Sequence, residues 1–180
     1  MPTINPVTLV SSNPEQKKLL EGLKAKMGRV PNIYATMAQS PATLEAVLNF
    51  NAGLKKGSLS PQEIEAIALA VGEKNSCHYC LAAHTVMGKM AGLSLEEMLD
   101  ARQGKARDEK LDRLVKLAVE IVSTQGRPQS ETIEAFRKAG YSDAALVEVV
   151  AWVSFNILTN YINHVADTEV DFPLAPSLGA

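Results

Sequence analysis

The chain has 180 residues, 46% of them hydrophobic, and its formal net charge at pH 7 is −2. This length suits one domain with a sizeable core, and the absence of charged blocks argues against a nucleic-acid-binding surface. The N-terminal residues lack the basic and apolar segments of a secretory signal, and no apolar run is expected to cross a membrane. We therefore expect a cytoplasmic protein without a nucleic-acid or membrane partner.

Apolar periodicity and capping signals predict an all-α protein, since no strand pattern of any length follows residue 13. Residues 1–13 are rich in β-branched residues and proline and are expected to form an extended arm, before a helical domain over residues 14–180. In chain order, helices are expected over residues 14–27, 33–39, 41–56, 61–72, 77–91, 95–101, 111–122, 131–139 and 143–166.

The fourth of these helices has the clearest start. Ser60 is expected at the N-cap, Pro61 at the first helical position, and Glu63 completes a capping box. Residues 64–71 are apolar on every side except at Glu65, so this helix is expected to be buried all round. Capping explains Glu63 but not Glu65. Glu65 is either an exposed first-turn carboxylate near the helix dipole or a buried carboxylate able to pass protons.

The only two cysteines, Cys77 and Cys80, have C-x-x-C spacing, and His84 follows Cys80 by four residues. If residues 77–91 are helical, these three side chains share one face, with the thiols within disulfide reach and an imidazole one turn beyond. A helix N-terminus and an adjacent base both favour the thiolate. Such a pair can form a disulfide and be reduced again, so we predict a reversible intramolecular disulfide.

Other interpretations of the cysteines remain open. They could be two small buried residues, because free cysteine is often buried. They could also be half of a zinc site with His84 as a third ligand, although only His78 and His164 remain as further histidines. Covalent haem attachment is excluded because Leu81, not histidine, follows Cys80.

A second polar feature lies in the long C-terminal helix, where Asn156, Asn160, Asn163 and His164 form a stripe at helical spacing. The stripe is either a satisfied polar seam against another helix or subunit, or one of its members lines the cysteine pocket.

The sequence also contains a weak internal repeat at an offset of 83 residues, called the internal echo below. It is consistent with a duplicated helical unit that kept its chemistry in one copy. The offset places Glu65, Cys77 and Cys80 on Glu148, Asn160 and Asn163.

These motifs together resemble the alkylhydroperoxidase D (AhpD)-like branch of the carboxymuconolactone decarboxylase family. The main one is a glutamate, eleven residues, CHYC, three residues and a histidine. Three shorter stretches support it: LSP just before that motif, VPN with a later SP, and NYINH followed by DFP. The main motif spans residues 65–84. LSP lies at residues 59–61, VPN and the later SP at 30–32 and 40–41, and NYINH and DFP at 160–164 and 171–173.

The resemblance implies an all-helical fold that assembles as trimers or hexamers and reduces peroxides with its thiols. It implies that Cys80 becomes the sulfenic acid, that Cys77 resolves it and donates a proton, and that Glu65 and His84 form a proton relay. The chain departs from the best-studied enzyme of this type at Tyr79, where that enzyme has a histidine, so the relay would lack one member.

The expected substrate is a small-molecule hydroperoxide. The expected reductant is a thiol of unknown identity, for example of the dihydrolipoyl type, and no cofactor or metal is expected. Helices 61–72 and 143–155 are apolar nearly all round, which favours a homo-oligomer. Two other functions remain: a decarboxylase, which would use histidine and carboxylate without the cysteines, and a non-enzymatic metal-binding or scaffold protein.

Overall fold

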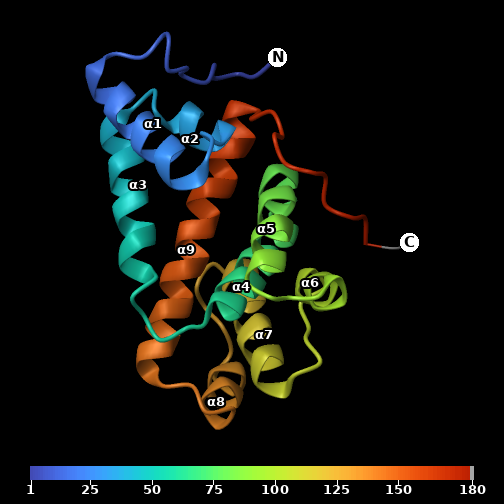
Figure 1. Ribbon diagram of the computed structural model, residues 1–180. Coiled ribbons are helices and arrows are strands. Elements are labelled where there is room, and N and C mark those ends of the chain that lie inside the picture. Colours follow the sequence, from blue (N-terminus) through green and yellow to red (C-terminus); the bar gives the residue numbers. More distant parts are fainter. Residues whose placement is uncertain (179–180) are drawn as a thin grey trace.

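The structure is a computed structural model and describes residues 1–178. Within that range the chain forms nine α-helices and no strand, which confirms the predicted all-α class (Figure 1). The helices are α1 (Pro14–Met27), α2 (Asn32–Met37), α3 (Pro41–Leu54), α4 (Pro61–Lys74), α5 (His78–Met90), α6 (Leu95–Arg102), α7 (Glu109–Ser123), α8 (Ser130–Lys138) and α9 (Asp143–Ala166).

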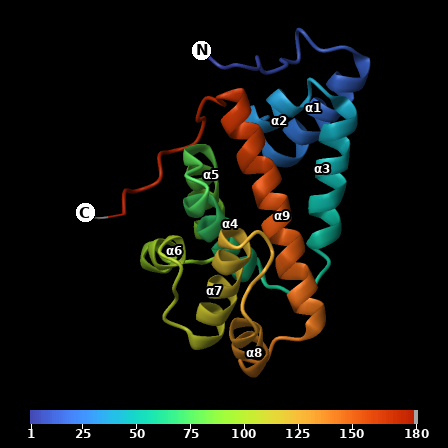
Figure 2. The same ribbon diagram turned by 180° about the vertical axis from the view of Figure 1, so that it is seen from behind.

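Helix α4 is the centre of the fold, because it packs against α5, α6, α7 and α9. Every residue from Ala66 to Gly72 is buried, as expected for a helix that is apolar on all sides. The long helix α9 runs along α4 and also contacts α2, α3, α5 and α7. Figures 1 and 2 show α1 to α3 on one side of α9 and α4 to α7 on the other, so α9 connects both groups.

Most helix starts follow the predicted capping chemistry. Ser60 and Glu63 form the capping box of α4, and Ser142 caps α9 by accepting a hydrogen bond from the backbone N–H of Ala145. The prediction for α8 was wrong by one residue: Ser130 is its first helical residue, and Gln129 occupies the N-cap. The N–H of Gln129 is bound by the carboxylate of Glu120 on α7, a tertiary contact that sequence spacing does not reveal.

The connection between α4 and α5 is shorter than predicted, since α4 continues to Lys74 instead of ending before residue 73. Ser76 then adopts a left-handed conformation with φ of 53°, and the N–H of Cys77 bonds to the carbonyl of Gly72. This six-to-one bond is the Schellman pattern that closes a helix C-terminus. Cys77 is consequently the N-cap of α5, which begins at His78 instead of residue 77.

Helix α9 corrects the expectation that no apolar run approaches membrane-spanning length. By length and composition alone its 24 residues could cross a membrane. Within this fold, however, Trp152, Asn156 and Asn160 on α9 are fully buried against other helices of the chain. We therefore interpret α9 as a core helix whose second face is also apolar.

The N-terminal arm passes near the C-terminal end of α9, where the C-terminal segment begins (Figures 1 and 2). In the N-terminal arm, the N–H of Thr3 bonds to the carbonyl of Ala166, and that of Val7 bonds to Ala35 in α2. The C-terminal segment follows the α5 side of the molecule, where the guanidinium of Arg102 bonds to the carbonyl of Pro176. Backbone hydrogen bonds therefore hold the N-terminal arm, and a side-chain hydrogen bond to a backbone carbonyl holds the C-terminal segment.

The internal echo aligns Glu148 with Glu65. Glu148 lies in the N-terminal part of α9, and its role there is structural. Its carboxylate accepts hydrogen bonds from the backbone N–H groups of Ser58 and Leu59, at 2.8 and 3.2 Å. It thereby ties the turn before α4 to α9.

We expect Glu148→Ala to lower the free energy of unfolding by about 1–2 kcal/mol, because two backbone donors lose their acceptor. Urea unfolding followed by circular dichroism measures this change. Glu45→Ala is the matched control, since Glu45 is exposed on α3. Equal stability of the two variants would contradict the role given to Glu148.

Candidate active site

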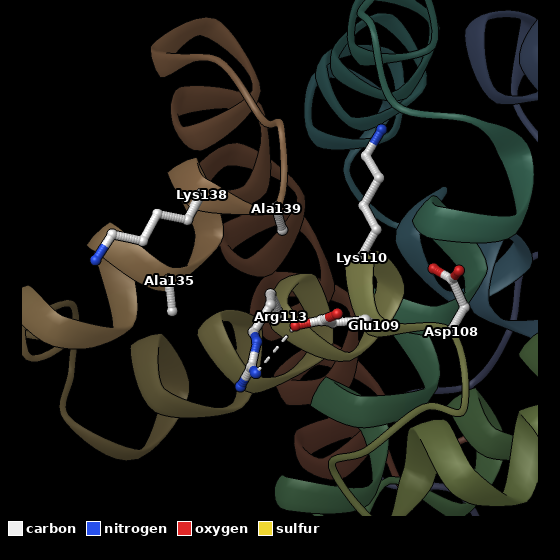
Figure 3. A pocket seen from close by; sticks show the side chains of 7 residues that line it. All are labelled: Asp108, Glu109, Lys110, Arg113, Ala135, Lys138 and Ala139. Atoms are coloured by element: carbon white, nitrogen blue, oxygen red, sulfur yellow. Dashed lines mark ion pairs between the residues drawn. The ribbon is translucent and has the colours of Figure 1, made fainter.

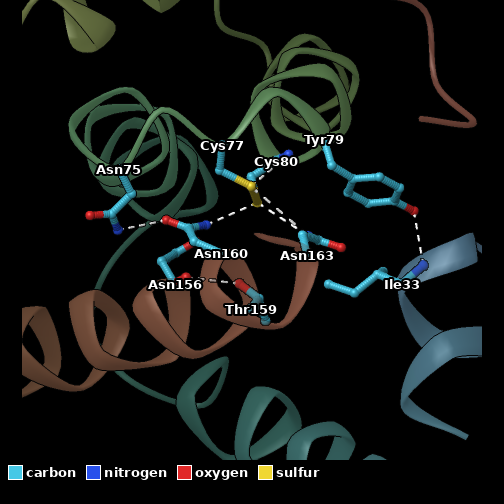
Figure 4. The surroundings of a disulfide bond; sticks show 9 residues. All are labelled: Ile33, Asn75, Cys77, Tyr79, Cys80, Asn156, Thr159, Asn160 and Asn163. Atoms are coloured by element: carbon cyan, nitrogen blue, oxygen red, sulfur yellow. Dashed lines mark hydrogen bonds between the residues drawn. A yellow bond between two sulfur atoms is a disulfide. The ribbon is translucent and has the colours of Figure 1, made fainter. Parts of the chain in front are cut away.

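Cys77 and Cys80 form a disulfide at the N-terminus of α5, facing α9 (Figure 4). Their Cα atoms are 5.3 Å apart, and the residues are only 1% and 3% exposed. The chain therefore encloses the dithiol pair that its C-x-x-C spacing predicted.

The backbone around the disulfide favours negative charge on sulfur. As N-cap of α5, Cys77 accepts a hydrogen bond through its Sγ from the N–H of Cys80, at 3.3 Å. The partial positive charge of the helix N-terminus acts on both residues of this first turn. A thiolate formed by reduction would therefore be stabilised at either position.

Helix α9 adds two side-chain donors to the sulfur of Cys80. The amide nitrogens of Asn160 and Asn163 lie 2.9 and 3.3 Å from this sulfur, whereas the distance from Asn163 to the sulfur of Cys77 is 4.0 Å. The amide oxygen of Asn160 accepts a hydrogen bond from Asn75 at 2.8 Å, which fixes the orientation of its amide group. The sulfur of Cys80 therefore has the closer side-chain hydrogen-bond donors of the two.

The polar stripe of α9 divides into members with different roles. Asn160 and Asn163 line the disulfide, as one of the two sequence interpretations proposed. Asn156 is buried one turn earlier and donates to the carbonyl of Trp152 on its own helix. His164 is exposed and stacks on Tyr161, so it does not line the cysteines.

Glu65 and His84 form a pair across the α4–α5 contact. The distance from His84 Nδ1 to Glu65 Oε2 is 2.7 Å, and the two side chains are 17% and 14% exposed. Glu65 is therefore largely buried and partnered, which rules out the exposed first-turn carboxylate. A neutral imidazole that donates its Nδ1 proton to a carboxylate leaves Nε2 as the acceptor, as in other carboxylate-oriented histidines.

Tyr79, between the two cysteines, points away from the sulfurs (Figure 4). Its hydroxyl donates to Asp171 at 2.7 Å and accepts from the N–H of Ile33 at 3.2 Å. Burial, and after it the Asp171 carboxylate, raise the pKa of Tyr79 well above its ordinary value, although the Ile33 N–H and the Arg29 guanidinium oppose this. Tyr79 therefore stays protonated and ties the C-terminal segment to α5 and α2.

Sequence reasoning did not identify two residues of this region. Asn75 is an ordinary residue at the end of α4, and nothing local indicates that it orients Asn160. Asp171 belongs to one of the family stretches, but its partners are distant in sequence: Tyr79 and Arg29, which bonds to it at 2.6 Å. The aromatic ring of Phe172 completes this cluster, 4.2 Å from the guanidinium of Arg29.

Other surface features are separate from the cysteines. Within residues 1–178, no group of three or more His, Cys, Asp or Glu side chains converges as a metal site would require. A hollow of about 460 Å³ lies between α7 and α8 (Figure 3). Its wall includes Lys110, Lys138 and an ion pair between Arg113 and Glu109, and it shares no residue with the cysteine cluster.

The segment that contains the cysteine motif is similar to a known protein family. Residues 41–106, which hold the Glu65, cysteine and His84 motif, match the carboxymuconolactone decarboxylase family. No curated protein matches the chain significantly. The family resemblance predicted from the sequence is confirmed over these residues by the family match.

Among the solved structures, the chain is similar to the AhpD core of a peroxidase-related protein from Ralstonia eutropha JMP134, with a TM-score of 0.85 and 20% identity over 94% of this chain and 92% of that one. A peroxidase-related protein from Silicibacter sp. TM1040 gives 0.79 and 20%, over 93% and 92%. The debrominase Bmp8, in complex with 2,3,4-tribromopyrrole, gives 0.79 and 16%, over 94% and 91%. These likenesses establish the AhpD-like fold.

We expect Tyr79→Phe to lower the free energy of unfolding by about 1–3 kcal/mol, because the buried N–H of Ile33 loses its acceptor and the partly buried Asp171 carboxylate loses one of its donors. Disulfide formation should persist, because the hydroxyl points away from the sulfurs. Chemical denaturation and thiol counting measure the two quantities. Tyr161→Phe is the control, since Tyr161 is 56% exposed. Unchanged stability with lost thiol oxidation would reverse this interpretation of Tyr79.

Proposed function

We propose that this protein is a thiol-dependent peroxidase that reduces alkyl hydroperoxides through Cys77 and Cys80. One observation carries the proposal: a C-x-x-C disulfide at a helix N-terminus lies on the same helix as His84, which is held by the Glu65 carboxylate. This arrangement combines a stabilised thiolate with a general acid–base pair. Those are the two requirements of thiol-based peroxide reduction.

In the first half-reaction the thiolate of Cys80 attacks the terminal oxygen of the hydroperoxide. The O–O bond breaks, an S–O bond forms, sulfur is oxidised to sulfenic acid, and the alkoxide leaves. The alkoxide takes a proton and departs as the alcohol. Cys77, or the relay of His84 and Glu65, supplies this proton.

In the second half-reaction the thiolate of Cys77 attacks the sulfenic sulfur of Cys80. The S–S bond forms, the S–O bond breaks, and hydroxide leaves with a proton as water. A dithiol reductant, for example of the dihydrolipoyl type, would then reduce the disulfide and become oxidised itself. The side-chain donors support Cys80 as the attacking sulfur, because two amides lie within 3.3 Å of it, whereas the one amide at the sulfur of Cys77 is 4.0 Å away.

A series of cysteine variants tests the assignment of roles. Cys80→Ser should abolish hydroperoxide consumption and leave no sulfenic acid to trap. Cys77→Ser should allow one attack and leave a trappable sulfenic acid on Cys80. Glu65→Gln and His84→Ala should each slow turnover at neutral pH about a hundredfold, the typical contribution of a general acid–base group.

Peroxide consumption and mass spectrometry with a sulfenic-acid trap measure these effects. Wild-type protein treated with peroxide should lose both thiols without forming a covalent dimer. Sulfenic acid on Cys77 in the Cys80→Ser variant would reverse the roles, and full activity of both relay variants would eliminate the relay. Carbon dioxide release that survives both cysteine substitutions would indicate a decarboxylase. Bromide release from a bromopyrrole would indicate dehalogenation.

We also propose that the protein is a homo-oligomer, of which trimers and hexamers are the expected forms. The supporting observation is an exposed apolar stripe along the second face of α9. It consists of Val147, Val150, Leu158, Tyr161 and Val165, all between 40% and 69% exposed. These residues recur at helical spacing with no charged residue among them, and a second copy of the same stripe would cover them.

Leu158→Glu should shift the molecular mass measured by light scattering towards the 19.4 kDa of one chain, because it places a charge within this stripe. Val10→Glu is the control, because Val10 is 98% exposed on the N-terminal arm. A wild-type mass near that of one chain at micromolar concentration would refute the oligomer.

A further inference from the structure

The amide of Asn163 differs from that of Asn160 in one respect that concerns substrate recognition. Asn160 uses both ends of its amide, since its nitrogen donates to the sulfur of Cys80 and its oxygen accepts from Asn75. Asn163 also donates to this sulfur, but its oxygen is buried and accepts no hydrogen bond from any residue between 1 and 178. Asn163 itself is only 4% exposed.

A buried acceptor without a partner is unfavourable, and a catalytic role is one explanation for such a group. In Figure 4 the oxygen of Asn163 points away from the sulfurs, towards the side where Ile33 and Tyr79 lie. The same amide therefore touches the reacting sulfur at one end and presents an acceptor at the other. A molecule that approaches Cys80 from this side meets an acceptor next to the nucleophile.

Resting on the peroxidase function proposed above, we infer that Asn163 is a catalytic residue whose amide oxygen binds the terminal O–H of the hydroperoxide. The O–H bond of that terminal oxygen stays intact while the oxygen moves from the alkoxide to the sulfur of Cys80. The oxygen of Asn163 accepts from this hydrogen in the hydroperoxide and again in the sulfenic acid. The proton that the alkoxide needs comes from elsewhere in the site, so this contact requires no proton transfer.

This geometry separates the tasks of the two asparagines. Hydrogen bonds to the charged form of an acid favour that form, so both amide nitrogens favour the thiolate of Cys80. Only Asn163 also recognises the substrate, because the oxygen of Asn160 is occupied by Asn75. Asn160 is therefore the control for Asn163, because its loss affects the thiolate of Cys80 but not substrate recognition.

The test uses the Cys77→Ser protein, in which Cys80 is the only thiol, and compares two electrophiles at the same pH. Iodoacetamide alkylation depends on the thiolate alone, whereas oxidation by cumene hydroperoxide depends on the thiolate and on recognition of the O–H. Asn160→Ala should slow both reactions by the same factor. Asn163→Ala should lower the ratio of the hydroperoxide rate to the iodoacetamide rate about tenfold, the effect of losing one hydrogen bond.

Asn156→Ala is the matched control on the same helix. Asn156 is equally buried and its amide oxygen also lacks a partner, but its amide nitrogen donates to the Trp152 carbonyl and to neither sulfur. This substitution should therefore change neither rate. Asn163→Ser is the second variant if Asn163→Ala does not fold. Its shorter side chain should show the same loss in the ratio. An unchanged ratio in the folded Asn163 variants overturns this inference and leaves the peroxidase intact. If the reduced wild-type protein does not react with hydroperoxides, both this inference and the peroxidase proposal are overturned.

Discussion

The cysteine site depends on the packing of α9 across α4 and α5. Cys77 and Cys80 are only 1% and 3% exposed. Their sulfurs therefore cannot rely on water for hydrogen bonds, and the protein must supply the donors. Helix α9 supplies two of them from one face, through Asn160 and Asn163, and the N-terminus of α5 supplies a third. A shift of α9 along its axis would leave the sulfur of Cys80 without its amide donors.

This arrangement resolves a competition between two electrostatic effects. The helix N-terminus acts on both cysteines, and the backbone N–H of Cys80 adds a hydrogen bond to the sulfur of Cys77, which favours a thiolate there. The α9 amides favour Cys80 instead, because both lie closer to its sulfur. Side-chain donors at 2.9 and 3.3 Å from α9 therefore support the second cysteine as the nucleophile, with Cys77 left to resolve it.

The tyrosine between the cysteines, Tyr79, connects distant segments of the fold, and its hydroxyl points away from the sulfurs. Its hydroxyl connects α5 to the start of α2 and to Asp171, which in turn bonds to Arg29. Three segments distant in sequence thus meet at the motif. The pair proposed for proton transfer, Glu65 and His84, consists of one carboxylate that orients one imidazole.

The sequence by itself determined the helices and the identity of the chemical groups. Helix capping and apolar periodicity are local, so the starts of α4 and α9 and the buried character of α4 were predictable. The spacing of Cys77, Cys80 and His84 depends on one helix and was predictable for the same reason. Only the tertiary structure decided that Glu65 faces His84, and that Asn160 and Asn163, not His164, reach the sulfurs. These contacts depend on the rotation and axial position of α9 and α4 against α5, which side-chain packing over the whole core sets and no local pattern encodes.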